Sequence, residues 1–226
     1  SNIKMEGQDW FCYPAKVGPL VIFIYFHKKF AELGFSLCNL FDIAEDDQIQ
    51  QKPDAVYCFG VDREEIEGIG ESNTIFYEDD KKDMMIAACP KDDMYGYFGY
   101  LKKMVLTLHN IIMMKRGVLP FHGALVNIML PKNKKATCLF IGDTGAGKSE
   151  TLEALCDLGK TEIQDIIVIA DDMGSIKVNK DGVMGYGTEI GAFLRLDDLK
   201  PGYALGQIDR AVIMSANKSM RVSSFQ

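Results

Sequence analysis

At 226 residues and 47% hydrophobic residues, the chain can bury the core of one large domain or of two small ones, which argues against a disordered protein. Its formal net charge of -7 argues against a surface that neutralises nucleic-acid phosphates or anionic lipids. We therefore expect neither a nucleic-acid partner nor a membrane partner.

The six cysteines are dispersed without a Cys-x-x-Cys pair, which favours free thiols in a reducing compartment. The longest apolar run, roughly residues 20–26, is too short to cross a bilayer, and no leader pattern precedes it. These features predict a cytoplasmic protein. The chain stops after Gln226 without a terminating signal, so truncation at the carboxyl end is one interpretation.

The first part of the chain alternates strand and helix patterns. Val21–Phe26 is β-branched and aromatic, as in a buried strand, and Lys28–Leu33 is expected to form a short helix. Further short strands are expected at residues 55–59, 74–77 and 84–87. The acidic clusters between these segments are expected to be solvated.

The strongest helical pattern covers residues 97–116, and Gly117 is well placed to end it. Apolar residues recur there at helical spacing: Leu101, Val105, Leu108 and Ile112. Lys103 falls on a polar stripe of the same helix, so it can point into a polar site rather than the core. We expect an amino-terminal α+β domain, residues 1–118, to end with this helix.

Two strands joined by a turn are expected next, at residues 123–129 and 136–141. A helix over 148–158 and an apolar strand over 166–170 follow. We expect these elements to form a second domain, residues 119–226.

A phosphate loop is expected between the second of those strands and the helix. It comprises Gly142, Asp143, Thr144, Gly145, Ala146, Gly147, Lys148 and Ser149, and Glu150 follows directly. Glycines let backbone N–H groups converge on an anion, and the following helix adds its positive amino-terminal end. Lys148 is expected to reach the outer phosphates, and the Ser149 hydroxyl is expected to hold the bridging divalent cation. The pattern predicts that all nine residues bind ATP or GTP with Mg²⁺.

Two further positions are candidates for catalysis. Asp171 and Asp172 close the apolar strand beyond the loop, where enzymes of this kind hold a metal or its water. The alternative is a polar turn before Gly174. His122 opens the strand that precedes the phosphate loop, but a lone histidine is more often structural.

The loop and its flanks resemble HPr kinase/phosphorylase. The segments that carry this resemblance are residues 142–155, Phe121-His122-Gly123-Ala124-Leu125-Val126 and Ala170-Asp171-Asp172. In that family's pattern Asp171 or Asp172 would act as a base towards a serine hydroxyl of a protein substrate, with His122 beside the phosphates.

The stretch before the loop is similar to ATP-dependent phosphoenolpyruvate carboxykinases, where it runs from a Gly-Glu-Met-Lys-Lys motif to a Met-His-Cys-Ser-Ala-Asn motif. Its counterparts here are Tyr97-Phe98-Gly99-Tyr100-Leu101-Lys102-Lys103, Leu106-Thr107, Asn110 and Lys115-Arg116-Gly117-Val118-Leu119-Pro120-Phe121-His122. The two families share a P-loop fold, and the resemblance covers residues 97–193. It implies an α/β protein in which a carboxykinase-like P-loop domain with a mixed sheet follows a smaller β-rich α+β domain.

The carboxykinase resemblance also implies a set of site residues. Lys103, His122 and Asp172 would be ligands of a catalytic Mn²⁺, while Lys148 and Ser149 would serve the nucleotide and its Mg²⁺. A lysine ligand must be deprotonated, which the cation itself favours. The substrate residues would be Tyr97, near the dicarboxylate, and Arg195, near phosphate.

Departures from the carboxykinase pattern keep the reaction open. The chain has few arginines, namely Arg63, Arg116, Arg195, Arg210 and Arg221, although arginine suits bidentate recognition of carboxylates. The leading expectation is ATP-dependent conversion of oxaloacetate to phosphoenolpyruvate. The alternatives are an HPr-kinase-like protein serine kinase or a catalytically weak nucleotide sensor. The expected partners are thus a nucleotide and a small-molecule or protein phosphoryl acceptor.

Overall fold

The computed structural model describes residues 3–5, 7–66, 74–142, 146–147, 151, 154–155, 163–195 and 211–214. These residues fall into two compact units. The first unit takes its residues from Ser1–Ile112 and Ile190–Gln226, and the second takes them from Met113–Glu189. The domain limits expected from the sequence stay a prediction.

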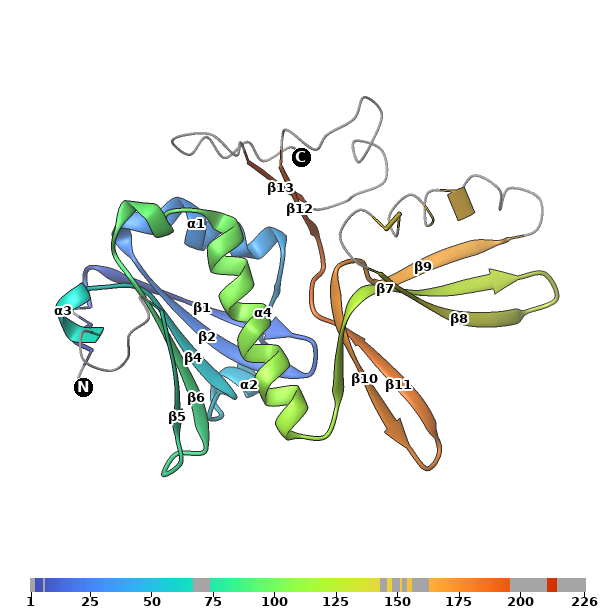
Figure 1. Cartoon of the computed structure of the whole chain (residues 1–226), viewed down its shortest axis with the longest axis horizontal. Helices are drawn as coiled ribbons and strands as arrows, with labels where there is room; N and C mark the ends of the chain where they lie inside the picture. The colour runs from blue at the N-terminus through green and yellow to red at the C-terminus, as the bar shows by residue number, and fades with distance from the viewer. Residues whose placement is uncertain are drawn as a thin grey trace. The chain divides into compact units, whose positions relative to one another are not determined.

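A six-stranded mixed sheet forms the centre of the first unit (Figure 1). Its strands are β1 (Trp10–Val17), β2 (Leu20–His27), β3 (Asp42–Ile43), β4 (Ala55–Val61), β5 (Ile75–Asp79) and β6 (Met84–Pro90), in the order β3-β1-β2-β4-β6-β5. The pairs β2–β4 and β4–β6 are parallel, and the remaining pairs are antiparallel. β12 (Ala192–Arg195) and β13 (Ala211–Met214) form a separate parallel pair in this unit.

The helical segments of the first unit connect these strands. They are η1 (Lys28–Phe30), α1 (Ala31–Phe35), η2 (Ser36–Asn39), α2 (Asp46–Ile49), α3 (Arg63–Ile66), η3 (Asp93–Tyr95) and α4 (Phe98–Lys115), the last of which continues into the second unit. Burial alternates along β2, so one face of the strand is in the core. The rings of Phe30 and Phe59, 4.6 Å apart between centroids, pack on that core face.

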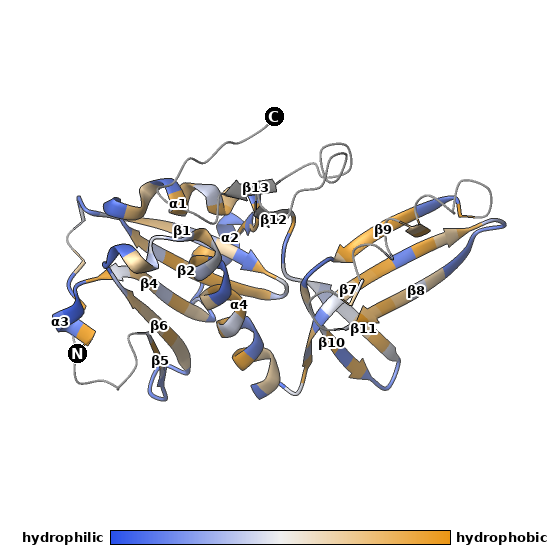
Figure 2. Ribbon diagram, turned by 45° about the horizontal axis from the view of Figure 1, so that its top comes forward, coloured by the Kyte–Doolittle hydropathy of each residue, from blue (hydrophilic) through white to orange (hydrophobic). Residues whose placement is uncertain are grey.

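The expected long helix is confirmed as α4, which lies across the sheet in both ribbon views (Figures 1 and 2). Leu101, Val105 and Leu108 are fully buried, while Lys103 is exposed on the polar stripe. The helix ends at Lys115, and Gly117 just beyond it has a left-handed φ of 70°. Among the helices that the structure describes, none has the length and hydropathy needed to cross a bilayer.

The second unit is built on long antiparallel strands. They are β7 (Leu119–Leu130), β8 (Lys134–Ile141), β9 (Asp165–Ala170), β10 (Met173–Asn179) and β11 (Gly182–Gly187). β7 pairs with β8 and β9 along its second half and with β10 along its first four residues. In Figure 2, hydrophobic colour runs along β7, β8 and β9, as expected for strands that share an apolar core.

The observed architecture confirms an α/β protein with a mixed sheet, and this mixed sheet lies in the first unit. The sequence placed the mixed sheet in the P-loop part, whereas every strand pair described in the second unit is antiparallel. The parallel pairs lie in the first unit, because the helical segments after β2, and the antiparallel strand β5 after β4, carry the chain back to the starting end of the sheet.

Candidate metal and nucleotide site

Strand pairing brings His122 and Asp172 together in the second unit. His122 lies on β7 opposite Met173, the first residue of β10, so Asp172 is the residue that leads into the paired strand. The His122 Nε2 atom lies 3.0 Å from Asp172 Oδ1. Each side chain is 46% exposed, so the pair is accessible to a ligand.

The main chain fixes this pair through Gly123. The Gly123 N–H donates to the Asp172 carbonyl oxygen at 2.9 Å, so the residue beside His122 holds the backbone of Asp172. A Cβ added at Gly123 would lie 2.3 Å from the Phe140 carbonyl oxygen. Only glycine therefore fits between β8 and the segment that carries Asp172.

The same glycine marks the start of the predicted phosphate loop. Gly123 is paired with Ile141, the last residue of β8, so the chain leaves β8 for the loop next to the His122–Asp172 pair. This register predicts that a phosphate bound by the loop would lie near the two side chains.

The far end of the loop is described at a few positions. Gly147 has a φ of 85°, which favours glycine, and its carbonyl oxygen accepts from Thr151 N at 2.9 Å and from Thr151 Oγ1 at 2.7 Å. Thr151, Ala154 and Leu155 are helical. The predicted nucleotide residues Asp143, Thr144, Gly145, Lys148, Ser149 and Glu150 lie outside the described residues, whereas Gly142 and the exposed Ala146 lie within them.

The geometry of the pair fits a divalent cation. Two neighbouring ligands of an octahedral cation, each about 2.1 Å from the metal, are roughly 3 Å apart. The separation of His122 Nε2 and Asp172 Oδ1 is that of a hydrogen bond, and it also matches this value. No group of three or more histidine, cysteine, aspartate or glutamate side chains within the described part of the chain could hold a metal, so any further protein ligand would have to be of another kind or lie elsewhere.

Thr188 supports the site and was missed in the sequence. Its hydroxyl donates to the Met173 carbonyl oxygen at 2.8 Å, and the residue is 2% exposed. This bond anchors the chain after β11 directly behind Asp172. The signal that could have found it is the glycine-rich segment ending in Gly187-Thr188-Glu189.

The other predicted site residues have separate surroundings. Asp171 is exposed beside Asp172 at the end of β9. Tyr97 immediately precedes α4, Lys103 is exposed on that helix and Arg195 ends β12, so all three belong to the first unit. Their roles as substrate and metal residues stay predictions.

The strands and the His–Asp pair define an α/β protein with a candidate cation site where two strand ends meet beside a glycine-rich loop. A family model described as phosphoenolpyruvate carboxykinase matches residues 20–208. The chain belongs to this family, in its ATP-dependent, carboxykinase-like branch. A comparison with curated proteins gives no match. ATP and divalent metals are the cofactors that the family generally uses.

Proposed function

We propose that the chain is a metal-dependent enzyme that uses ATP to convert oxaloacetate to phosphoenolpyruvate. Family membership supports the ATP-dependent, carboxykinase-like class. The observation that carries the proposal further is the His122–Asp172 contact, which lies next to the end of β8, where the predicted phosphate loop begins.

In the proposed reaction, oxaloacetate loses carbon dioxide to give an enolate, and the enolate oxygen then attacks the γ-phosphorus of ATP while ADP leaves. Lys148 would neutralise charge on the transferred phosphoryl group, and the loop amides would orient the phosphates. A divalent cation held by His122 and Asp172 would stabilise negative charge on oxygen. Tyr97 and Arg195 would bind the substrate.

Neutral imidazole and ionised carboxylate are the forms that the proposed roles require. His122 would present Nε2 as an acceptor towards the cation, and Asp172 would supply an anionic oxygen. In the kinase alternative, Asp171 at the end of β9 would act as a base towards an incoming hydroxyl.

A coupled assay with oxaloacetate, ATP and Mn²⁺ tests the proposal by measuring phosphoenolpyruvate. We expect turnover in the wild-type chain, its loss in Lys148→Ala and Asp172→Asn, and its retention in Asp181→Asn. Asp181 is a matched control because it is an exposed aspartate in the β10–β11 turn. Product formation by the wild type no greater than that of Lys148→Ala would exclude the carboxykinase reaction.

The scarcity of arginine favours a second candidate, transfer of the γ-phosphoryl group to a protein serine. The chain has five arginines, and Arg63 is already paired with Asp92. A hydroxyl acceptor needs a base such as Asp171 or Asp172 rather than a bidentate clamp for a dicarboxylate. Incubation with ATP, Mg²⁺ and the protein HPr, followed by phosphoserine detection, tests this candidate. ATP binding with no turnover in either assay would instead indicate a nucleotide sensor.

A further inference from the structure

The turn between β7 and β8 carries a set of lysines that no acidic side chain balances. Lys132, Lys134 and Lys135, here called the lysine turn, are all exposed at the tip of this hairpin (Figure 1). Within the described residues, none of them makes an ion pair or a side-chain hydrogen bond with a carboxylate.

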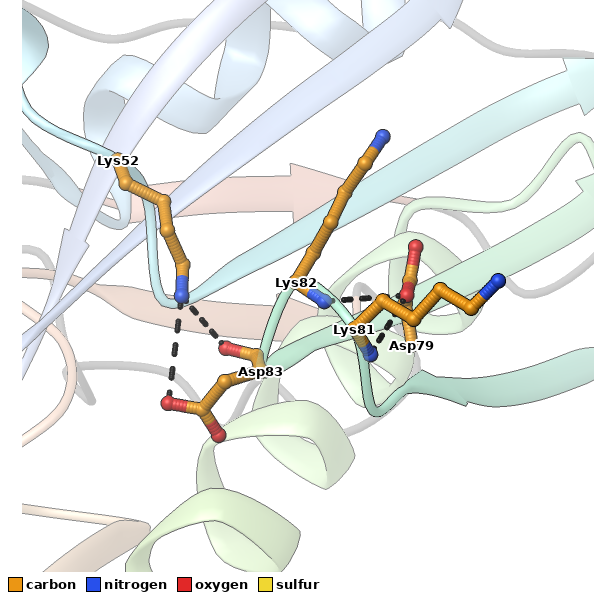
Figure 3. A network of polar contacts seen from close by, with 5 residues as sticks. All are labelled: Lys52, Asp79, Lys81, Lys82 and Asp83. Carbon is orange, nitrogen blue, oxygen red and sulfur yellow. Dashed lines mark hydrogen bonds and ion pairs between the residues drawn. The ribbon is translucent and has the colours of Figure 1, made fainter.

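Some lysines of the first unit lie close to acidic residues. At the turn between β5 and β6, Lys52 Nζ donates to the Asp83 carbonyl oxygen at 2.8 Å, and the Asp79 carboxylate accepts from the backbone N–H groups of Lys81 and Lys82 (Figure 3). Acidic and basic residues are thus neighbours in that turn. Elsewhere in the unit, three lysines form ion pairs with aspartates: Lys28 with Asp9, Lys29 with Asp93 and Lys91 with Asp62.

The backbone of the lysine turn adds a second observation. Lys132 and Asn133 have φ values of 62° and 57°, a left-handed conformation that asparagine and glycine accept more readily than lysine. A lysine at such a position is a local cost in stability. The turn geometry places Lys132 at the tip of the hairpin.

The chain itself presents a matching acidic surface. Asp42, Glu45, Asp46 and Asp47, here called the acidic edge, are exposed around β3, which is an edge strand of the six-stranded sheet. No ion pair among the described residues includes these four carboxylates. Ile43, between them in sequence, is 54% exposed and offers an apolar contact.

We infer that the lysine turn of one copy of the chain docks on the acidic edge of a second copy. The local charges are opposite, and over contact distances they outweigh the net repulsion of two acidic molecules because charges more than about 8 Å apart are screened at physiological ionic strength. Exposed ion pairs are individually weak, so the contact forms a transient, salt-sensitive dimer.

Sedimentation equilibrium of the full chain at low and high salt tests the inference. We expect the wild type to show a concentration-dependent dimer at 50 mM NaCl that dissociates at 500 mM. The double variants Lys134→Glu/Lys135→Glu and Asp46→Lys/Asp47→Lys should each raise the dissociation constant at least about tenfold, because each places like charges opposite one another.

Mixing the two double variants is the decisive test of the docking inference. When one copy of each variant associates, the glutamates of the altered lysine turn face the lysines of the altered acidic edge. An equimolar mixture should therefore recover the dimer that neither variant forms alone. Lys177→Glu/Lys180→Glu, on the β10–β11 hairpin, is the control because it makes the same change of charge at a different hairpin. A monomeric wild type, no recovery in the mixture, or an equal loss in the control would overturn the inference.

Discussion

The Nε2 atom of His122 and the Oδ1 atom of Asp172 are 3.0 Å apart although fifty residues separate them in the chain. The contact follows from the register of β7 against β10 and from the bond between Gly123 N and the Asp172 carbonyl oxygen. The arrangement is rigid in the backbone, so a ligand of this pair would find its two donor atoms already spaced for a single cation.

Removing either side chain of the pair should weaken cation binding. We expect His122→Ala and Asp172→Asn each to raise the dissociation constant for Mn²⁺ by about a hundredfold or more, since loss of even a supporting residue behind a ligand commonly costs 10–100-fold. Titration of Mn²⁺ followed by electron paramagnetic resonance measures this directly. Asp181→Asn should bind like the wild type, and equal affinities across all three variants would show that the pair does not hold the metal.

Substitution of Gly123 by alanine should damage both stability and the site. The new methyl group would lie 2.3 Å from the Phe140 carbonyl oxygen, which belongs to the backbone and cannot rotate away. Overpacking of this kind costs about 1–3 kcal/mol. Chemical denaturation measures the loss, and the Mn²⁺ titration above should show weaker binding because Asp172 shifts.

Gly7→Ala is the matched control, since an added Cβ there meets nothing within 4 Å. A Gly123→Ala protein as stable as Gly7→Ala would mean that β8 and the Asp172 segment separate readily. That result would remove the argument that the backbone positions the pair.

The sequence predicted α4 and β2 within one residue of their observed ends. Apolar residues at helical spacing indicated α4, and a run of β-branched and aromatic residues indicated β2. β1 was missed, since Lys16 and the exposed Phe11 and Cys12 interrupt its pattern. β10 and β11 were missed too, because exposed valines and glycines on both faces obscure the alternation.

The site could be predicted only in part for a related reason. Asp172 and the glycines of the phosphate loop are local signals, readable from a strand end or a short motif. The partnership of His122 with Asp172 depends on strand register, which composition does not determine. A lone histidine was therefore ambiguous until resemblance to carboxykinases assigned it a role.

The buried histidine of α4 should make stability depend on pH. His109 is fully buried, its Nδ1 atom lies 3.0 Å from Asn110 Oδ1, and burial lowers the pKa of its imidazole below the usual 6.5. At pH values between this lowered pKa and 6.5, the imidazole of His109 binds a proton in the unfolded chain but not in the folded chain. The contribution of His109 to stability is thus complete above about pH 6.5 and declines as the pH falls below it.

Urea denaturation of the wild type and of His109→Leu from pH 7.5 to 5 measures this effect. The difference between the two proteins removes the contribution of the carboxylates, which both share. We expect the wild type to lose more stability than His109→Leu over this range. Parallel profiles would indicate that His109 gains protons equally in the folded and unfolded chains.

The end of α4 gives a prediction that depends on backbone conformation alone. Gly117 N donates to the Met114 carbonyl oxygen at 3.0 Å, and Val118 N donates to the Met113 carbonyl oxygen at 2.9 Å, which is the pattern of a Schellman cap. Gly117 has a φ of 70°, and nothing lies within 4 Å of an added Cβ. Gly117→Ala should therefore destabilise the chain by about 1 kcal/mol through strain in the left-handed region, without a clash. Gly117→Asn should cost less, because asparagine tolerates this conformation. Denaturation curves of the two variants give the comparison, and equal losses would show that the side chain, rather than the backbone, limits this position.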